Sequence, residues 1–319
     1  MSQLIAIVSG EPNSINSEII GKTWKRLKIK KNLFIIGNYF LLKKQLNKIN
    51  FKIRISKINS INEIKNKDIL YVLDVPLKFK SPFKISLTES RKYVIKSLDI
   101  AHILAVKKKI KGFINAPINK KIFNNKYLGV TEYLAFKNNV KGKELMIIYN
   151  KRLSVVPLTT HLEIKNVTKK IKINLIKNKV LVLRKYYNNI FKKEPRIAIL
   201  GLNPHNSENR KNSVEKQFIK PSVKILKKLK VNILGPFPAD TAFSVQKRID
   251  FDVIVGMYHD QVLAPFKALY NYDAINITLG LKYLRVSPDH GTALDIVGLN
   301  KANPQSMLSA VHFLKKIND

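Results

Sequence analysis

Cysteine is absent from the 319 residues, which excludes disulfides, thiolate nucleophiles and cysteine-ligated zinc or iron–sulfur sites. Long apolar runs are absent too, since no stretch reaches the roughly 18–20 residues that a membrane-spanning helix needs. The first residues carry no basic region and no small-residue cleavage site, so they predict a strand rather than a signal peptide. We therefore expect a cytoplasmic protein with no membrane partner.

Glycine is scarce, with 12 residues in the chain. No two glycines are separated by a single residue, so the chain has no G-x-G-x-x-G pattern and any dinucleotide must bind without that fingerprint. Gly21-Lys22-Thr23 resembles the end of a phosphate-binding P-loop. That pattern also requires a glycine where this chain has Asn16, so the phosphate cradle is incomplete.

Acidic residues are few, 21 against 59 Lys and Arg, which gives a formal net charge of +38. Such a charge raises the question of nucleic-acid binding. The basic residues are 50 Lys and 9 Arg, however, and specific recognition of phosphates and bases favours the planar fork of Arg. The lysines are also spread along the chain. We interpret them as solvated surface residues and expect no specific nucleic-acid partner.

The pattern of apolar residues predicts an α/β fold, because short apolar runs alternate with longer amphipathic stretches. The length and a hydrophobic fraction of 45% suit two α/β lobes. The predicted strands are residues 4–9, 32–36, 69–73, 112–116, 145–149, 153–157, 196–202, 231–234, 252–257 and 274–278. The predicted helices are residues 88–107, a long one within 165–191, 214–230 with a kink or a start at Pro221, and 304–317.

Three apolar strands each run into a polar loop that carries a histidine: His161, His205 and His259. Ligands of open α/β sheets bind just outside the carboxyl ends of the strands. Three imidazoles at such places are a plausible set of ligands for a divalent metal ion. Alternatively, each histidine only caps a loop or fills a gap. The spacing does not show that they converge, and some could meet only across a subunit interface.

More polar residues follow the third histidine. Lys267 and Arg285 supply positive charge for a phosphate or carboxylate, and Asn276 lies between them in sequence. Arg285 is the more informative of the two basic residues, because Arg is rare in this chain. Asp240, at the end of the loop 235–241, either holds a histidine or contacts a ligand, or caps the next helix at 241–245.

Nine segments occur in an order that resembles one family. They are SGEP (9–12), APINK (116–120), GVTEYLA (129–135), PLTTH (157–161), GLNPH (201–205), GPFPADTAF (235–243), YHDQ (258–261), NITLGL (276–281) and RVSPDHGTALDI (285–296). Together they resemble 4-hydroxythreonine-4-phosphate dehydrogenase, an enzyme of pyridoxal phosphate synthesis. The resemblance covers essentially the whole chain.

This resemblance implies a two-domain α/β fold of the isocitrate/isopropylmalate dehydrogenase type, with the active-site cleft between the domains. We expect residues 1–128 plus 291–319 to form the first domain. Residues 129–290 would form the second, which carries the metal ligands and the dimer interface. The family works as a homodimer with a shared active site. Its metal ligands fall on His161, His205 and His259, for one divalent ion per site, with zinc, cobalt, manganese and magnesium all left open.

The family's substrate contacts fall on Thr131, Lys267, Asn276 and Arg285. The implied reaction is oxidation of 4-phosphooxy-L-threonine by NAD at its C3 hydroxyl, after which the 3-keto acid loses its carboxylate to give 3-amino-2-oxopropyl phosphate. The base is left open between a lysine and a metal-linked water. Lys267 and Asp240 are the candidate catalytic residues. The alternatives are a related dehydrogenase of 4-phosphothreonate or 4-phosphoerythronate, and a decayed member that binds without turnover.

The segment from His290 to Gly298, followed by Asn303, resembles the adenosine-binding loop of decarboxylating dehydrogenases. The residues expected to line the NAD site are His290, Gly291, Thr292, Asp295 and Asn303. The alternative is a helix start that is capped by Thr292.

The chain departs from the family's pattern at three places. Val130 stands where the family has a histidine before the threonine, and this change alters the substrate side of the site. The first loop, residues 11–18, and the loop after His205, residues 206–213, are poorer in glycine than is usual. Where the backbone needs a positive φ, each replaced glycine costs roughly 1–2 kcal/mol, and asparagine tolerates that region better than most residues.

Overall fold

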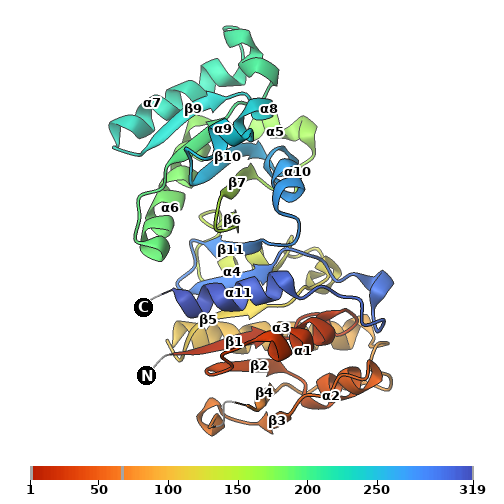
Figure 1. Cartoon of the computed structure of the whole chain (residues 1–319). Helices are drawn as coiled ribbons and strands as arrows, with labels where there is room; N and C mark the ends of the chain where they lie inside the picture. Colours follow the sequence, from red (N-terminus) through yellow and green to blue (C-terminus); the bar gives the residue numbers. More distant parts are fainter. Residues whose placement is uncertain (1–2, 66–67, 318–319) are drawn as a thin grey trace. The chain divides into compact units, whose positions relative to one another are not determined.

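A computed structural model of the chain describes residues 3–65 and 68–317 (Figure 1). The chain divides into two compact units, which we describe separately. Unit 1 comprises Met1–Asn139 and Leu281–Asp319, and unit 2 comprises Val140–Gly280. None of the helices in the described ranges is long and apolar enough to cross a membrane.

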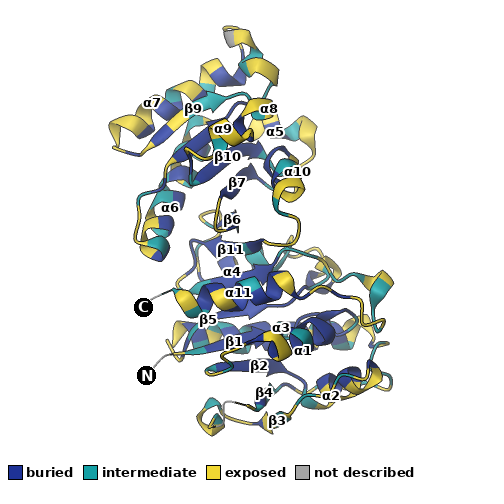
Figure 2. Cartoon of the chain, in the orientation of Figure 1, coloured by how far each residue is buried: buried dark blue, intermediate teal, exposed yellow. Residues whose placement is uncertain are grey.

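Unit 1 is built on a parallel sheet with the strand order β3-β4-β2-β1-β5-β12. Both faces of such a sheet are covered, which explains apolar runs such as LIAIV and LFIIG in its central strands. Helix α1 packs between α2 and α11, whereas α3 packs on β1, β2 and β5. Figure 2 shows the buried residues gathered in the strands and on the inner sides of these helices. The strands are β1 (Leu4–Val8), β2 (Leu33–Gly37), β3 (Ile55–Ile58), β4 (Leu70–Asp74), β5 (Ile110–Asn115) and β12 (Leu284–Pro288), and the helices are α1 (Asn16–Arg26), α2 (Tyr39–Lys48), α3 (Leu87–Val106), α4 (Val130–Lys137) and α11 (Gln305–Lys316).

Unit 2 has a mixed sheet with the order β11-β6-β7-β10-β8-β9. Strand β6 pairs antiparallel with both β11 and β7, and the pairs from β7 through β10 and β8 to β9 are parallel. One of its apolar clusters includes Leu200, Ile254 and Phe266, all fully buried. The strands are β6 (Leu145–Tyr149), β7 (Ser154–Thr159), β8 (Ile197–Leu200), β9 (Ile233–Phe237), β10 (Val253–Tyr258) and β11 (Ile275–Leu279), and the helices are α5 (Ile164–Lys170), α6 (Ile173–Phe191), α7 (Lys220–Lys228), α8 (Ala239–Ala242), α9 (Val245–Arg248) and α10 (His259–Tyr270).

The α/β prediction is confirmed, and every predicted strand overlaps an observed one. Strands β3 and β12 were missed. The helix predicted within 165–191 is broken into α5 and α6, and the one at 214–230 begins with a π-helical turn before α7. Pro221 lies in the first turn of α7, directly after the π-helical turn at Glu215–Ile219. Helices α1, α2, α4 and α10 were also missed.

Candidate active site

The three histidine loops leave one edge of the unit 2 sheet. Strands β7, β10 and β8 are neighbours and run parallel, so their carboxyl ends lie together. His161 follows β7, His205 follows β8, and His259 opens α10 directly after β10. The fold therefore puts all three histidines where open α/β sheets bind their ligands.

Two of these histidines lie side by side. The ring centroids of His161 and His259 are 6.4 Å apart, with 31° between the ring planes. Nδ1 of His259 is 2.8 Å from a carboxylate oxygen of Asp260, an arrangement that leaves Nε2 for a ligand. Among the residues described, no group of three or more His, Asp or Glu side chains is placed to hold a metal ion. The three-histidine metal site thus stays a prediction.

His205 lies in a strained loop. The backbone of residues 205–208 is left-handed, with φ values of 49°, 55°, 51° and 48°. The carboxylate of Glu215 anchors one end by accepting hydrogen bonds from the backbone N–H groups of Leu202 and Asn203, at 2.9 and 2.8 Å. Burial would raise the pKa of Glu215, but these hydrogen bonds outweigh it and hold the pKa below its usual value.

The expectation about glycine-poor loops applies only where the backbone needs a positive φ, a condition that the second loop meets and the first does not. In the second loop, histidine, serine and glutamate occupy left-handed positions, at roughly 1–2 kcal/mol each. In the first loop, only Gly10, at φ 72°, has a positive φ. Asn16 there donates from its side chain to the carbonyl of Pro117 at 2.8 Å and to that of Glu11 at 3.3 Å. Side-chain hydrogen bonds therefore hold the first loop without left-handed strain.

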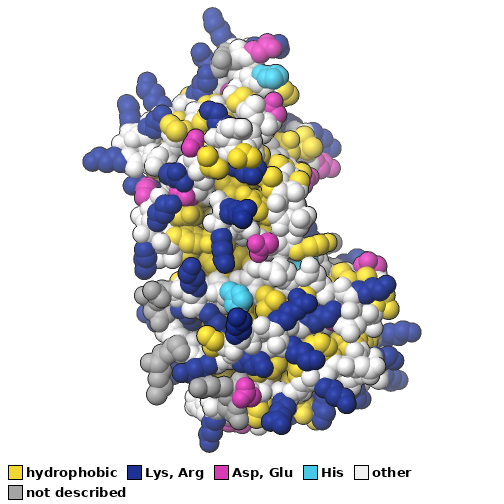
Figure 3. Space-filling model, in the orientation of Figure 1, with side chains coloured by type: hydrophobic (Ala, Val, Ile, Leu, Met, Phe, Trp, Pro, Cys, Tyr) yellow, Lys and Arg dark blue, Asp and Glu magenta, His cyan; other side chains and the backbone are white. Residues whose placement is uncertain are grey.

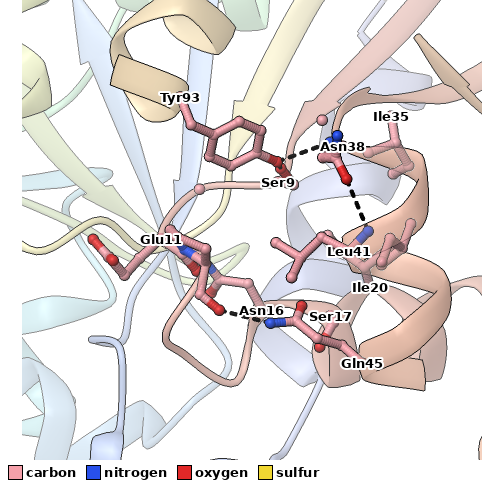
Figure 4. A pocket seen from close by; sticks show the side chains of 14 residues that line it. Ser9, Glu11, Asn16, Ser17, Ile20, Ile35, Asn38, Leu41, Gln45 and Tyr93 are labelled. Atoms are coloured by element: carbon pink, nitrogen blue, oxygen red, sulfur yellow. Dashed lines mark hydrogen bonds between the residues drawn. The ribbon is translucent and has the colours of Figure 1, made fainter. Parts of the chain in front are cut away.

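A small cavity lined by polar and apolar side chains lies under this first loop (Figure 4). The hydroxyls of Ser9 and Tyr93 are hydrogen-bonded to each other, and Tyr93 also accepts from the backbone N–H of Asn38 at 3.0 Å. Gln45 donates to the carbonyl of Pro12 at 2.7 Å. The cavity volume is about 10 Å³, about the space that one water needs. It is too small for a phosphorylated substrate.

Two of the predicted substrate residues meet in unit 1. Arg285 on β12 donates from Nη1 to the hydroxyl of Thr131 at 3.3 Å and from Nε to the side-chain oxygen of Asn115 at 2.6 Å. The Arg285 side chain is only 4% exposed. Burial lowers its pKa to about 10, against the opposing effect of Glu132, so the guanidinium is still charged at neutral pH.

Asn115 is a residue that sequence reasoning missed. It ends β5, one position before the APINK motif, and is 2% exposed. The signal was a polar side chain at the carboxyl end of an apolar strand, which is the same signal that pointed to the histidines.

The other predicted residues are in unit 2. Lys267 lies on an exposed position of α10, and Asn276 is half-buried on β11, with a side-chain oxygen that has no hydrogen-bond partner among the described residues. Asp240 is exposed in the first turn of α8, where Pro238 is the N-cap residue. Asp240 therefore does not cap that helix, and its remaining predicted roles stand.

The predicted cofactor residues share one loop of unit 1, between β12 and α11. The carbonyl of Thr292 accepts from the backbone N–H of Ile15 at 3.3 Å. A short 3₁₀ turn at Leu294–Ile296 follows Ala293 and has no side-chain cap, so Thr292 does not cap a helix. The Asn303 side chain accepts from the N–H of Gln305 at 2.9 Å and starts α11.

Comparison with known proteins identifies the family. The model of the family "Pyridoxal phosphate biosynthetic protein PdxA" matches residues 29–314. This chain belongs to the PdxA family. It is 38% identical to 4-hydroxythreonine-4-phosphate dehydrogenase of Sulfurihydrogenibium sp., over 96% of each chain. It is 27% identical to D-threonate 4-phosphate dehydrogenase of Pectobacterium atrosepticum, over 99% of this chain and 100% of the other.

The fold of this PdxA chain is also that of a solved relative. The crystal structure of 4-hydroxythreonine-4-phosphate dehydrogenase from Klebsiella pneumoniae superposes with a TM-score of 0.87 at 29% identity, covering 98% of this chain and 97% of the other. The family resemblance drawn from the sequence motifs is therefore confirmed.

Proposed function

We propose that this PdxA chain oxidises 4-hydroxythreonine 4-phosphate at its C3 hydroxyl with NAD, as a cytoplasmic homodimer that needs a divalent metal ion. In this reaction NAD would accept hydride from C3 and a base would take the hydroxyl proton. The 3-keto acid would then lose CO₂ and take up a proton at C2 to give 3-amino-2-oxopropyl phosphate. The observation that carries this proposal is the buried contact of Arg285 with Thr131. It joins two family motifs that are far apart in sequence around one fixed positive charge.

The chain's own residues supply binding and orientation. A guanidinium held by Asn115 and Thr131 offers a charged donor for the substrate's phosphate. Lys267 and Asn276 offer a second charge and an amide, and Lys267 is the candidate that takes the hydroxyl proton.

The donor set suits a divalent ion. His161, His205 and His259 would hold it, since all three follow carboxyl ends of adjacent parallel strands and imidazole suits such ions. When bound, the ion would lower the pKa of the substrate hydroxyl. His290, Gly291, Thr292, Asp295 and Asn303 would line the NAD site. The homodimer proposal rests on the resemblance to the family.

A related substrate is the second candidate. Val130 replaces the family's histidine at the start of α4, next to the substrate residue Thr131, and one relative is named a D-threonate 4-phosphate dehydrogenase. Loss of an imidazole beside the substrate favours a change in the groups that are recognised there. This alternative predicts faster turnover of 4-phosphothreonate than of its amino-containing counterpart. A decayed, non-catalytic protein predicts turnover of neither.

The test is NADH formation by the purified protein with each substrate in turn. We expect turnover of 4-hydroxythreonine 4-phosphate that a chelator abolishes and that His259→Ala reduces by at least about a hundredfold. His312→Ala is the matched control, because His312 is an exposed histidine on α11 outside the proposed site. Full turnover by His259→Ala would reject the metal-dependent function.

A further inference from the structure

Helix α1 is tied to the loop that precedes α11 by two of its side chains. The ammonium of Lys22 donates to the carbonyl oxygens of Asn300 and Ala302, both at 2.9 Å, and to Oε1 of Glu18 at 2.8 Å. The same oxygen of Glu18 accepts from the backbone N–H of Ala302 at 2.6 Å. One ion pair therefore holds both the N–H and the carbonyl of Ala302, which lies 280 residues after Lys22 in the sequence.

The surroundings of this ion pair make it rigid. The side chain of Glu18 is 2% exposed and that of Lys22 is 17% exposed. An ion pair taken out of water is weak evidence for stability, but its hydrogen bonds are directional and select one arrangement. The second oxygen of Glu18 is buried with no hydrogen-bond partner in the described part of the chain. Burying a carboxylate oxygen without a hydrogen-bond partner costs free energy, so closing the loop does not by itself account for this ion pair.

The held loop is the one that carries the proposed cofactor residues. Asn303 directly follows Ala302, which Glu18 and Lys22 hold. Earlier in the same loop, the carbonyl of Thr292 accepts a hydrogen bond from the backbone N–H of Ile15, the residue just before α1. Helix α1 and the residue just before it thus hold the loop at two places, one on each side of its centre. Lys22 lies in the segment that resembles a P-loop, yet its ammonium is used on backbone carbonyls.

We propose that Glu18 and Lys22 are positioning residues for dinucleotide binding, which they support by holding residues 300–303 in the binding arrangement. The inference rests on the proposed function, because it takes the loop as the NAD site. It assigns no direct contact with the dinucleotide to either side chain. Their removal should therefore weaken dinucleotide binding and leave the phosphorylated substrate's own KM nearly unchanged.

The experiment compares Lys22→Met, Lys22→Arg and the double variant Glu18→Gln/Lys22→Met with the wild type. The double variant avoids a buried unpaired carboxylate and keeps an acceptor for the N–H of Ala302, so it folds even where Lys22→Met does not. Lys92→Met is the control, since Lys92 pairs with Glu89 on an exposed face of α3, away from this loop.

Two measurements are made on each variant. The first is the NADH dissociation constant by fluorescence, alongside KM values and kcat. The second is the rate of trypsin cleavage after Lys301, because that bond includes the N–H that Glu18 holds. We expect about tenfold weaker NADH binding and faster cleavage for Lys22→Met and the double variant, with partial rescue by Lys22→Arg.

Three outcomes would overturn the proposal, and they can be told apart. If wild-type protein binds NADH and the variants bind it equally well, the positioning role is wrong while the proposed function stands. If a lowered melting temperature comes with equal losses for NADH and substrate, the ion pair is only structural. If wild-type protein binds no NADH at all, the proposed function fails as well.

Discussion

Arg285 is a buried cation that stays charged in the fold, and we propose that it binds the substrate. Two neutral oxygens, from Asn115 and Thr131, satisfy part of its donor set and hold the plane of the guanidinium. Its pKa stays near 10 although burial lowers it. The nearby carboxylate of Glu132 also favours the charged form of Arg285, which is the form that would bind a phosphate.

The substitution Arg285→Lys tests whether the guanidinium of Arg285 binds the phosphate of the substrate. An ammonium cannot bond Asn115, Thr131 and a phosphate with the geometry of the planar fork. We expect the KM of the phosphorylated substrate to rise about 10- to 100-fold, which corresponds to about 1.4–2.8 kcal/mol. The KM of NAD should change little. Arg54→Lys, at an exposed position, is the control, and an unchanged substrate KM in Arg285→Lys would remove Arg285 from the substrate site.

At the scale of elements, the loop after β8 stores strain and is held by Glu215. Four consecutive left-handed residues persist only if their surroundings fix them. The buried carboxylate of Glu215 does so at one end, and Asn206 bonds the carbonyl of Pro236 at 3.1 Å in the middle.

Glu215→Gln should lower the free energy of unfolding by about 1–3 kcal/mol at neutral pH, because charge-assisted hydrogen bonds become neutral ones. The pKa of Glu215 is lowered in the folded state, so its stabilisation is complete above the unfolded value of 4.5 and is lost as the pH falls through the folded pKa. Denaturant unfolding at several pH values measures this. The deficit should shrink in acid, and a deficit that is constant with pH would contradict the assignment. Glu89→Gln, on an exposed face, is the control.

The sequence predicted elements well where apolar periodicity was strong and missed them where buried residues are polar. Strand β12 was missed because Arg285 and Ser287 break its apolar run, although both are buried. Helix α1 was missed because it begins with Asn16, Ser17 and Glu18, which are polar and also buried. Those side chains are buried by contacts with segments far along the chain, and no local pattern could show this.

The residues of the candidate site likewise fall into those that the sequence predicted and those that it missed. The rule that ligands bind at strand ends put each histidine after a strand, and the fold then brought these strand ends together. The resemblance to the family named Thr131 and Arg285 as substrate contacts, and the fold brings the two into contact. Neither the strand-end rule nor the family motifs predicted the contact of Asn115 with Arg285 or that of Lys22 with Ala302. Each contact joins residues that are far apart in sequence and that only the folded chain brings together.

At the scale of the whole molecule, the excess positive charge is dispersed over the face that Figure 3 shows. Figure 3 shows Lys and Arg side chains scattered over the visible face of both units rather than gathered in one patch. Lysine stems can cover apolar surface while their ammonium groups stay in water. On this face the net charge of +38 fits a general surface property, and the proposed substrate binding depends instead on a few fixed groups such as the buried Arg285.

The most direct test of the account is a metal titration of the chelator-treated protein, with NADH formation from 4-hydroxythreonine 4-phosphate as the readout. The account predicts no turnover without a divalent ion and full recovery at about one ion per active site. Turnover that is equally fast with and without the ion would contradict it, and so would a fully metal-loaded protein that forms no NADH from any four-carbon phosphorylated acid.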